Sequence, residues 1–200
     1  MMKYRLIIFD LGGVLIEYNE PEYYAYLSSK YNLSFRRVQK TFESLSPAFE
    51  TGKMTLTSFE TLAAKGLGLK RSQLEWSYAF KRLASKNRHV EALIKRLRKK
   101  YKVALLTNNN RSRYEIAAAK FFDPKIFDRT FVSYLMGMRK PSASIYRRVL
   151  SEMGVKASET VFVDNMEKNV TGANRVGIRG ILYTNYTRLE NELRHIGVAE

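Results

Sequence analysis

The sequence contains no cysteine, which excludes disulfide bonds, thiolate metal ligands and a cysteine nucleophile and fits a reducing compartment. No apolar run approaches the roughly 18 residues of a membrane span, and Asp10 comes too early for a secretory signal peptide. Histidine is also scarce, since His89 and His195 are the only two and neither belongs to a metal-binding pattern. We therefore predict a cytoplasmic protein without a membrane partner.

Acidic residues are few relative to basic ones: 19 Asp and Glu stand against 35 Lys and Arg, which gives a net charge of +16. The excess is uneven, because residues 81–113 hold twelve Lys or Arg and a single acid, Glu91. A basic field attracts nucleic acid, anionic membranes or phosphorylated small molecules. A solvated helix face in a generally basic protein is the simpler explanation, and the sequence leaves both open.

Apolar residues make up 45% of the chain, enough for one core or for a core with a small insert. The first apolar run, Leu6–Phe9, is short, rich in β-branched and aromatic residues, and free of glycine and proline. Such a run predicts a strand buried on both faces, as in a parallel sheet. Further strands are predicted at residues 102–106, 128–133, 160–163 and 180–183.

Helical spacings alternate with these strands in the second half of the chain. Helices are predicted at residues 90–97, 114–121, 141–153, 168–176 and 189–196. Strands that alternate with helices predict an α/β fold with a doubly wound parallel sheet.

Between the first strand and residue 88 the pattern is different. Aromatic residues are frequent and apolar positions recur at helical spacing, without a convincing strand. About four short helices are predicted, and Pro47 is expected to interrupt the second. Thr57, with Glu60 three residues later, is the expected N-cap of the third helix, and Ser72 is the expected start of the fourth. This segment is therefore predicted to be a helical bundle inserted into the α/β domain.

Polar residues follow three of the predicted strands, in the order Asp10, then Thr107 and Asn108, then Asp164 and Asn165. Because parallel strands bring their carboxyl ends to one edge of the sheet, these residues can meet in one crevice, together with Lys140. Two facing carboxylates repel unless a cation lies between them, and oxygen ligands suit Mg²⁺. The hydroxyl, amide and ammonium groups of the set are donors for an anion. The set therefore predicts phosphoryl transfer to Asp10.

Four stretches of the chain are also recognisable as motifs: IIFDLGGVL, LLTNN, RKPSASIY and VFVDNMEKNVTGANRVGI. In this order they resemble the four successive motifs of the haloacid dehalogenase (HAD) superfamily, and the resemblance covers nearly the whole chain. It implies a Rossmann-like core domain of residues 1–16 and 89–200. Residues 17–88 would then be a small α-helical cap domain.

The same resemblance implies roles in catalysis and substrate binding. Asp10 would be the nucleophile that forms an aspartyl-phosphate. Thr107 and Lys140 would hold the phosphoryl oxygens, and we expect Asn108 to contribute beside them.

The resemblance also implies a Mg²⁺ site, with Asp10, Asp164 and the backbone carbonyl of Gly12 as ligands. Asn165 stands where a second acid is frequent, and it keeps an oxygen but loses a charge, which should weaken Mg²⁺ binding modestly. Asn169 is expected to orient this loop.

Gly12 is a departure from the phosphatase pattern, which usually has a second Asp at this position as general acid and base. A positioned acid or base is typically worth roughly 10²–10⁴-fold in rate. The backbone carbonyl remains whatever the side chain, so the metal is less affected. The first motif, D-L-G-G-V, is also similar to that of a sub-branch of sugar-phosphate phosphatases.

The sequence thus predicts a Mg²⁺-dependent phosphatase that acts on a small phosphorylated metabolite. Metal-independent dehalogenation is one alternative, because it uses the same nucleophile against carbon and needs no acid at Gly12. A catalytically degenerate protein that binds phosphate or nucleic acid is another, since it would explain both Gly12 and the basic stretch 81–113. The substrate and the oligomeric state stay open. Tyr18, Glu50 and Lys53 are candidates for substrate recognition, because they lie near polar turns of the insert.

Overall fold

The computed structural model describes residues 3–18 and 20–198. Its centre is a sheet of five parallel strands in the order β5-β4-β1-β6-β7. These strands are β1 (Leu6–Phe9), β4 (Lys102–Thr107), β5 (Arg129–Val132), β6 (Thr160–Asp164) and β7 (Arg179–Leu182). The predicted parallel α/β sheet is confirmed.

The order of the strands reverses at β1. From β1 the chain continues to β4 and β5 on one side of the sheet, and then returns to β6 and β7 on the other. Ligands of open α/β sheets bind at such a switch point, outside the carboxyl ends of the strands. Asp10 directly follows β1 and therefore lies at the switch point.

Helices cover both faces of the sheet, and the side chains of β1 divide between them. Ile7 and Phe9 pack toward α5 (Arg88–Leu97), α6 (Arg111–Lys120) and α10 (Tyr186–His195), whereas Leu6 and Ile8 pack toward α8 (Ala143–Met153) and α9 (Glu167–Arg175). All four side chains are fully buried. A strand covered on both faces needs apolar residues at every position, which explains the continuous run.

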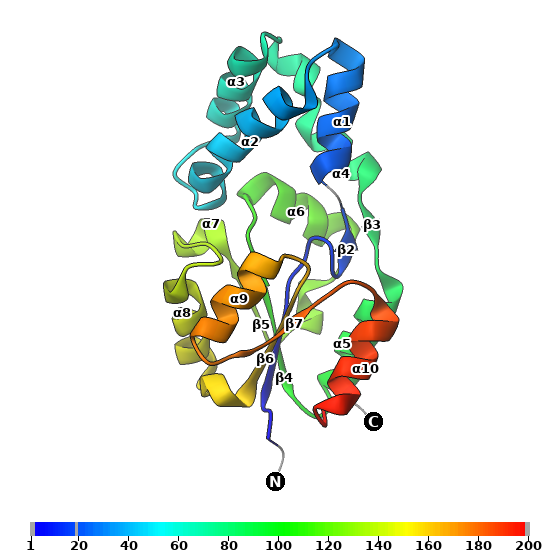
Figure 1. Ribbon diagram of the computed structural model, residues 1–200, viewed down its shortest axis with the longest axis vertical. Coiled ribbons are helices and arrows are strands. Elements are labelled where there is room, and N and C mark those ends of the chain that lie inside the picture. The colour runs from blue at the N-terminus through cyan, green and yellow to red at the C-terminus, as the bar shows by residue number, and fades with distance from the viewer. Residues whose placement is uncertain (1–2, 19, 199–200) are drawn as a thin grey trace.

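The insert lies at the carboxyl end of the sheet, above the strands in Figure 1. It consists of α1 (Glu20–Tyr31), α2 (Phe35–Glu50), α3 (Leu56–Leu67), the 3₁₀ turn η1 (Arg71–Leu74) and α4 (Trp76–Leu83). These helices share an apolar cluster of their own, rich in aromatic rings, in which Phe49 stacks on Phe59 with ring centroids 4.1 Å apart. The predicted helical insert is confirmed, and it has a core separate from that of the sheet.

Three local predictions for the insert were wrong. α2 continues through Pro47, because Phe42 and Phe49 on the same helix are both buried in the aromatic cluster. Their burial offsets the cost of an internal proline, about 3 kcal/mol. Thr55 rather than Thr57 is the N-cap of α3, and its Oγ1 accepts from the Ser58 N–H at 3.1 Å. The fourth helix begins at Trp76 because Glu75 adopts a left-handed conformation with φ 49°.

A short antiparallel ribbon joins the insert to the core, where no strand was predicted. β2 (Ile16–Glu17) pairs with β3 (Ser85–Lys86), and two residues per strand are too few to produce a sequence pattern. The remaining elements are η2 (Pro124–Ile126), α7 (Ser133–Met136) and η3 (Ala157–Glu159). No helix within the described residues is long and apolar enough to cross a membrane.

Candidate active site

Lys140 is the centre of the candidate site, and its side chain is fully buried. Its Nζ donates to the Leu106 carbonyl oxygen at 2.9 Å and to Asp164 Oδ2 at 2.6 Å, and lies 2.8 Å from Asp10 Oδ1. These three partners match the three N–H bonds of an ammonium group. The structure therefore brings Asp10, at the end of β1, and Asp164, at the end of β6, onto one buried cation.

The charges of this cluster do not balance. Burial raises the pKa of Asp10 above its usual range, although the nearby Lys140 ammonium lowers it and Asp164 raises it further. Burial lowers the pKa of Lys140, but the two carboxylates outweigh this effect and the net shift is upward. One ammonium thus serves two carboxylates in a dry environment, and a second cation beside them would be electrostatically favourable.

Asp164 is held by the beginning of α9. Its Oδ1 accepts from the Met166 N–H at 2.8 Å, and the Asn169 amide donates to Oδ1 and Oδ2 at 3.0 and 3.1 Å. The backbone carbonyl of Asn169 in turn accepts from the Tyr146 hydroxyl at 2.7 Å. Asn169 thus fixes the direction of the Asp164 carboxylate.

The Asn108 side chain makes two hydrogen bonds to the backbone of Lys140, one as donor and one as acceptor. Its Nδ2 donates to the Lys140 carbonyl oxygen at 3.0 Å, and its Oδ1 accepts from the Lys140 N–H at 2.8 Å. The sequence did not indicate this contact, which ties the end of β4 to the loop that carries the lysine. Thr107 is buried at the last position of β4.

The two glycines after Asp10 have different requirements. Gly13 has φ +77°, and a Cβ there would lie 2.0 Å from Asn165 Nδ2, so a side chain is excluded. Gly12 does not adopt the left-handed conformation, and a Cβ at this position would meet no atom within 4 Å. The structure therefore has room for a side chain where phosphatases of the resembled pattern carry an acid.

The available donors fit Mg²⁺ better than a transition metal. The carboxylates of Asp10 and Asp164 are oxygen ligands, as the predicted Gly12 carbonyl and Asn165 Oδ1 would be, and oxygen ligands suit a hard cation that keeps several waters. No group of three or more His, Cys, Asp or Glu in the described part of the chain could hold a metal. Neutral oxygens would therefore have to complete the ligand set.

Of the ion pairs between insert and core, the first is centred on Arg113 of α6, whose side chain is 10% exposed. Its Nη1 lies 2.6 Å from Glu20 Oε1, and its Nη2 donates to the Tyr18 hydroxyl at 3.0 Å. The guanidinium also stacks 3.8 Å from the centre of the Trp76 ring. In the sequence Arg113 is one basic residue among twelve in residues 81–113, so no signal distinguished it.

The second ion pair is formed by Glu50, the last residue of α2, whose Oε2 lies 2.8 Å from Arg139 Nη2. Its backbone carbonyl accepts from Ser133 Oγ at 2.6 Å, and Ser133 Oγ accepts from the Asn109 N–H at 2.9 Å. Of the three recognition candidates, Tyr18 and Glu50 lie between insert and core, whereas Lys53 is exposed.

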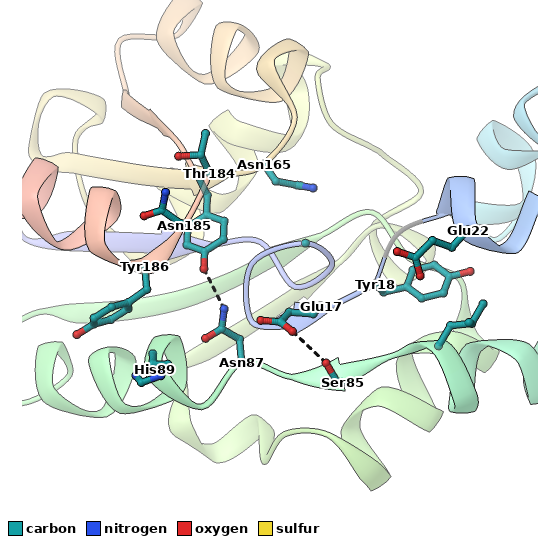
Figure 2. Close-up of a pocket in the computed structure, with 13 residues that line it drawn as sticks. Glu17, Tyr18, Glu22, Ser85, Asn87, His89, Asn165, Thr184, Asn185 and Tyr186 are labelled. Atoms are coloured by element: carbon teal, nitrogen blue, oxygen red, sulfur yellow. Dashed lines mark hydrogen bonds between the residues drawn. The ribbon is translucent and has the colours of Figure 1, made fainter. Parts of the chain in front are cut away.

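A polar cavity of about 590 Å³ flanks the site next to the β2–β3 ribbon (Figure 2). Gly13 and Asn165 belong to its wall, whereas Asp10 does not. An Asn87–Tyr183 hydrogen bond of 2.9 Å crosses the wall. The cavity therefore adjoins the loops that follow β1 and β6 without being lined by the central lysine cluster.

Several known proteins are similar to this chain in sequence. The haloacid dehalogenase-like hydrolase family matches residues 4–177. The sesquiterpene phosphatase astK of Aspergillus oryzae is 29% identical over 197 residues, which cover 96% of each chain. The D-ribitol-5-phosphate phosphatase of Bacteroides thetaiotaomicron is 25% identical over 86% of this chain and 87% of its own. The drimenol cyclase drtB of Aspergillus calidoustus is 24% identical over 96% of this chain, which spans only 36% of that longer protein.

A solved structure has a similar fold. It is a HAD family enzyme from Bacteroides thetaiotaomicron in complex with magnesium and inorganic phosphate. The two structures superpose with a TM-score of 0.78 at 24% identity, over 93% of this chain and 98% of the other.

Proposed function

This chain belongs to the haloacid dehalogenase-like hydrolase family, and we propose that it is a Mg²⁺-dependent phosphatase that acts on a small phosphorylated metabolite. The observation that carries the proposal is the buried cluster in which Lys140 contacts both Asp10 and Asp164 at the switch point of the sheet. The match to two phosphatases over most of their length supports the same reaction type.

In this proposal Asp10 attacks phosphorus and forms an aspartyl-phosphate, which water then hydrolyses. Thr107 and Lys140 stabilise the phosphoryl oxygens. Because the three N–H bonds of Lys140 already have partners, the lysine has to exchange one of them for the substrate. The Asn108 side chain is engaged by the Lys140 backbone, so it contributes by positioning the lysine.

We assign Mg²⁺ to the oxygens of Asp10, Gly12, Asp164 and Asn165. When bound, the ion neutralises charge on the carboxylates and on the phosphoryl group. The unbalanced charge of the buried cluster supports this assignment, as does the related fold in complex with magnesium and phosphate. We also propose that residues 17–88 act as a cap over the catalytic crevice.

Release of phosphate from p-nitrophenyl phosphate tests this function, with and without Mg²⁺. We expect activity that requires Mg²⁺ and falls to the buffer background in Asp10→Asn, because an amide is no nucleophile. Asp123→Asn is the matched control, since Asp123 is exposed and lies outside the four motifs, and asparagine keeps the oxygen that accepts from the Lys125 N–H at 2.9 Å. Activity in the Asp10→Asn variant, or full activity with chelator, would contradict the proposal. A panel of phosphate esters would then identify the substrate.

The two alternatives have direct tests of their own. Chloride release from 2-chloropropionate with chelator present would establish dehalogenation. For nucleic-acid binding, a gel-shift titration at two salt concentrations is decisive, because phosphate-driven affinity is greatest at low salt. Several cations of the basic stretch already have carboxylate partners within the chain, which reduces the free charge: Lys86 and Lys95 with Glu91, Arg96 with Glu190, and Arg98 with Asp128.

A further inference from the structure

Hydrolysis of an unactivated phosphate ester needs a proton for the departing oxygen, and position 12 carries no acid. We propose that Glu50 of the insert is the general acid that protonates the leaving group and the general base that then activates water. This assignment rests on the proposed phosphatase function and adds to it a catalytic residue outside the four motifs.

The backbone of Glu50 is fixed against the catalytic loops. Its carbonyl oxygen accepts from Ser133 Oγ, which also accepts from the N–H of Asn109, the residue after the predicted phosphate-binding pair. Its carboxylate contacts Arg139, the neighbour of Lys140 in the chain. Glu50 therefore comes from the insert but is positioned by the loop that contains Asn109 and the loop that contains Arg139 and Lys140.

Burial of the Glu50 side chain favours its protonated form, whereas the contact with Arg139 favours the carboxylate. The side chain is 18% exposed, and Oε2 accepts no hydrogen bond of good geometry among the described residues, although Arg139 Nη2 lies 2.8 Å away. Burial raises the pKa of Glu50 above its usual value, Arg139, Arg113 and Lys140 lower it, and Glu20 raises it, with a net upward shift. A carboxyl of this kind stays protonated to higher pH than an exposed glutamate, as a general acid requires.

Glu20 is another carboxylate between insert and core, and its contacts differ. Its Oε1 is bound to Arg113 Nη1 at 2.6 Å, its Oε2 accepts from the Tyr24 hydroxyl at 3.3 Å, and its side chain is 41% exposed. Both oxygens of Glu20 are thus engaged in anchoring. Glu20 is therefore a matched control: it is a glutamate that joins insert and core but transfers no proton in the proposed reaction.

Glu50 gives a proton to the leaving group in the first half of the reaction and takes one from water in the second. Asp10 Oδ forms a bond to phosphorus while the bond from phosphorus to the leaving oxygen breaks, and the Glu50 carboxyl gives its proton to that oxygen. In the second half, the Glu50 carboxylate takes a proton from water as the water oxygen bonds to phosphorus. The bond between phosphorus and Asp10 breaks, inorganic phosphate leaves, and Glu50 is again protonated.

The test compares kcat/KM for an alkyl phosphate, which needs a proton on its leaving group, with kcat/KM for p-nitrophenyl phosphate, which hardly does. In Glu50→Gln we expect the alkyl rate to fall about 10²-fold or more while the aryl rate falls less than about tenfold. Glu20→Gln should change both rates by the same factor. In the wild type, kcat/KM for the alkyl phosphate should begin to fall at a lower pH than kcat/KM for p-nitrophenyl phosphate as the pH is raised, because the alkyl ester needs the protonated form of Glu50.

Three outcomes separate the possibilities. An equal loss of both rates in folded Glu50→Gln overturns the role of Glu50 and leaves the phosphatase function intact. Identical pH profiles for the two esters in the wild type overturn it as well, and this measurement needs no variant to fold. Absence of phosphate release from either ester in the wild type, with Mg²⁺ present, is instead a failure of the proposed function.

Discussion

The buried ion pairs of Lys140 and the ion pairs of Glu20 and Glu50 between insert and core are built differently. Lys140, Asp10 and Asp164 are at most 10% exposed; Asp10 and Asp164 lie at the ends of β1 and β6, and Lys140 lies in the loop between α7 and α8. In the pairs between insert and core, the carboxylates of Glu20 and Glu50 are 41% and 18% exposed, and each pair joins two separately packed parts of the chain. The core thus holds Lys140, Asp10 and Asp164 in one buried cluster, whereas the contacts of Glu20 and Glu50 depend on how the insert docks on the core.

This difference suits separate roles for the two regions, with the chemical step in the core and substrate entry controlled by the insert. Phosphoryl transfer needs a nucleophile and an electrostatic environment that are preorganised before the substrate arrives. Substrate entry needs a part that can move without unfolding. The insert has its own aromatic cluster, which holds it together as a unit, and it is joined to the core through the β2–β3 ribbon, a few polar contacts and Phe80 of α4, which packs in the core cluster against Phe121.

The largest expected effect is that of Lys140→Met. Removing the ammonium leaves two carboxylates buried without their shared partner, and breaking a buried pair in this way costs about 3–5 kcal/mol in the free energy of unfolding. Urea denaturation followed by circular dichroism measures this loss, and phosphatase activity should disappear with it. Lys53→Met, at an exposed site, is the control. A decrease below about 1 kcal/mol in the free energy of unfolding would show that the buried cluster tolerates the loss of a charged partner as well as a surface ion pair does.

A smaller effect is expected for Arg113→Met, because water can reach the half-exposed Glu20 that loses its partner. Loss of hydrogen bonds to a charged group predicts a decrease of about 1.5–3 kcal/mol in the free energy of unfolding. Glu20→Gln and the double variant complete a cycle that isolates the pair. A loss equal to that of Lys140→Met would remove the distinction between the two regions.

The smallest effect is expected for Gly12→Asp, which places an acid on the core side of the crevice. The backbone conformation and the open space at Gly12 accept the side chain. In the wild type the ratio of alkyl to aryl rate should rise only a few-fold, because Glu50 already supplies the proton. In the Glu50→Gln background the same substitution should restore about 10²-fold in the alkyl rate. An unchanged ratio in both backgrounds, with normal thermal melting, would mean that Asp at position 12 cannot reach the leaving oxygen.

Much of the core was predictable because its signals are local. Leu6–Phe9 is apolar at every position because both faces of a central parallel strand are covered. The polar residues that end β1, β4 and β6 follow from the same topology, since parallel strands end at one edge. The errors fell in the insert, where the burial of Phe42 and Phe49 overrode Pro47.

The sequence by itself therefore determined the parallel sheet, the helical insert and the strand-end residues Asp10 and Asp164, because each depends on the order of residues along one segment. Only the tertiary structure decided which residues of the insert meet the core. Glu50 contacts Arg139, and Glu20 contacts Arg113, across separations of 89 and 93 residues. Contacts between residues so far apart produce no periodic pattern in the sequence. Such pairs form because two independently packed clusters dock in one orientation, and that orientation is set by surface complementarity rather than by the pattern of any single segment.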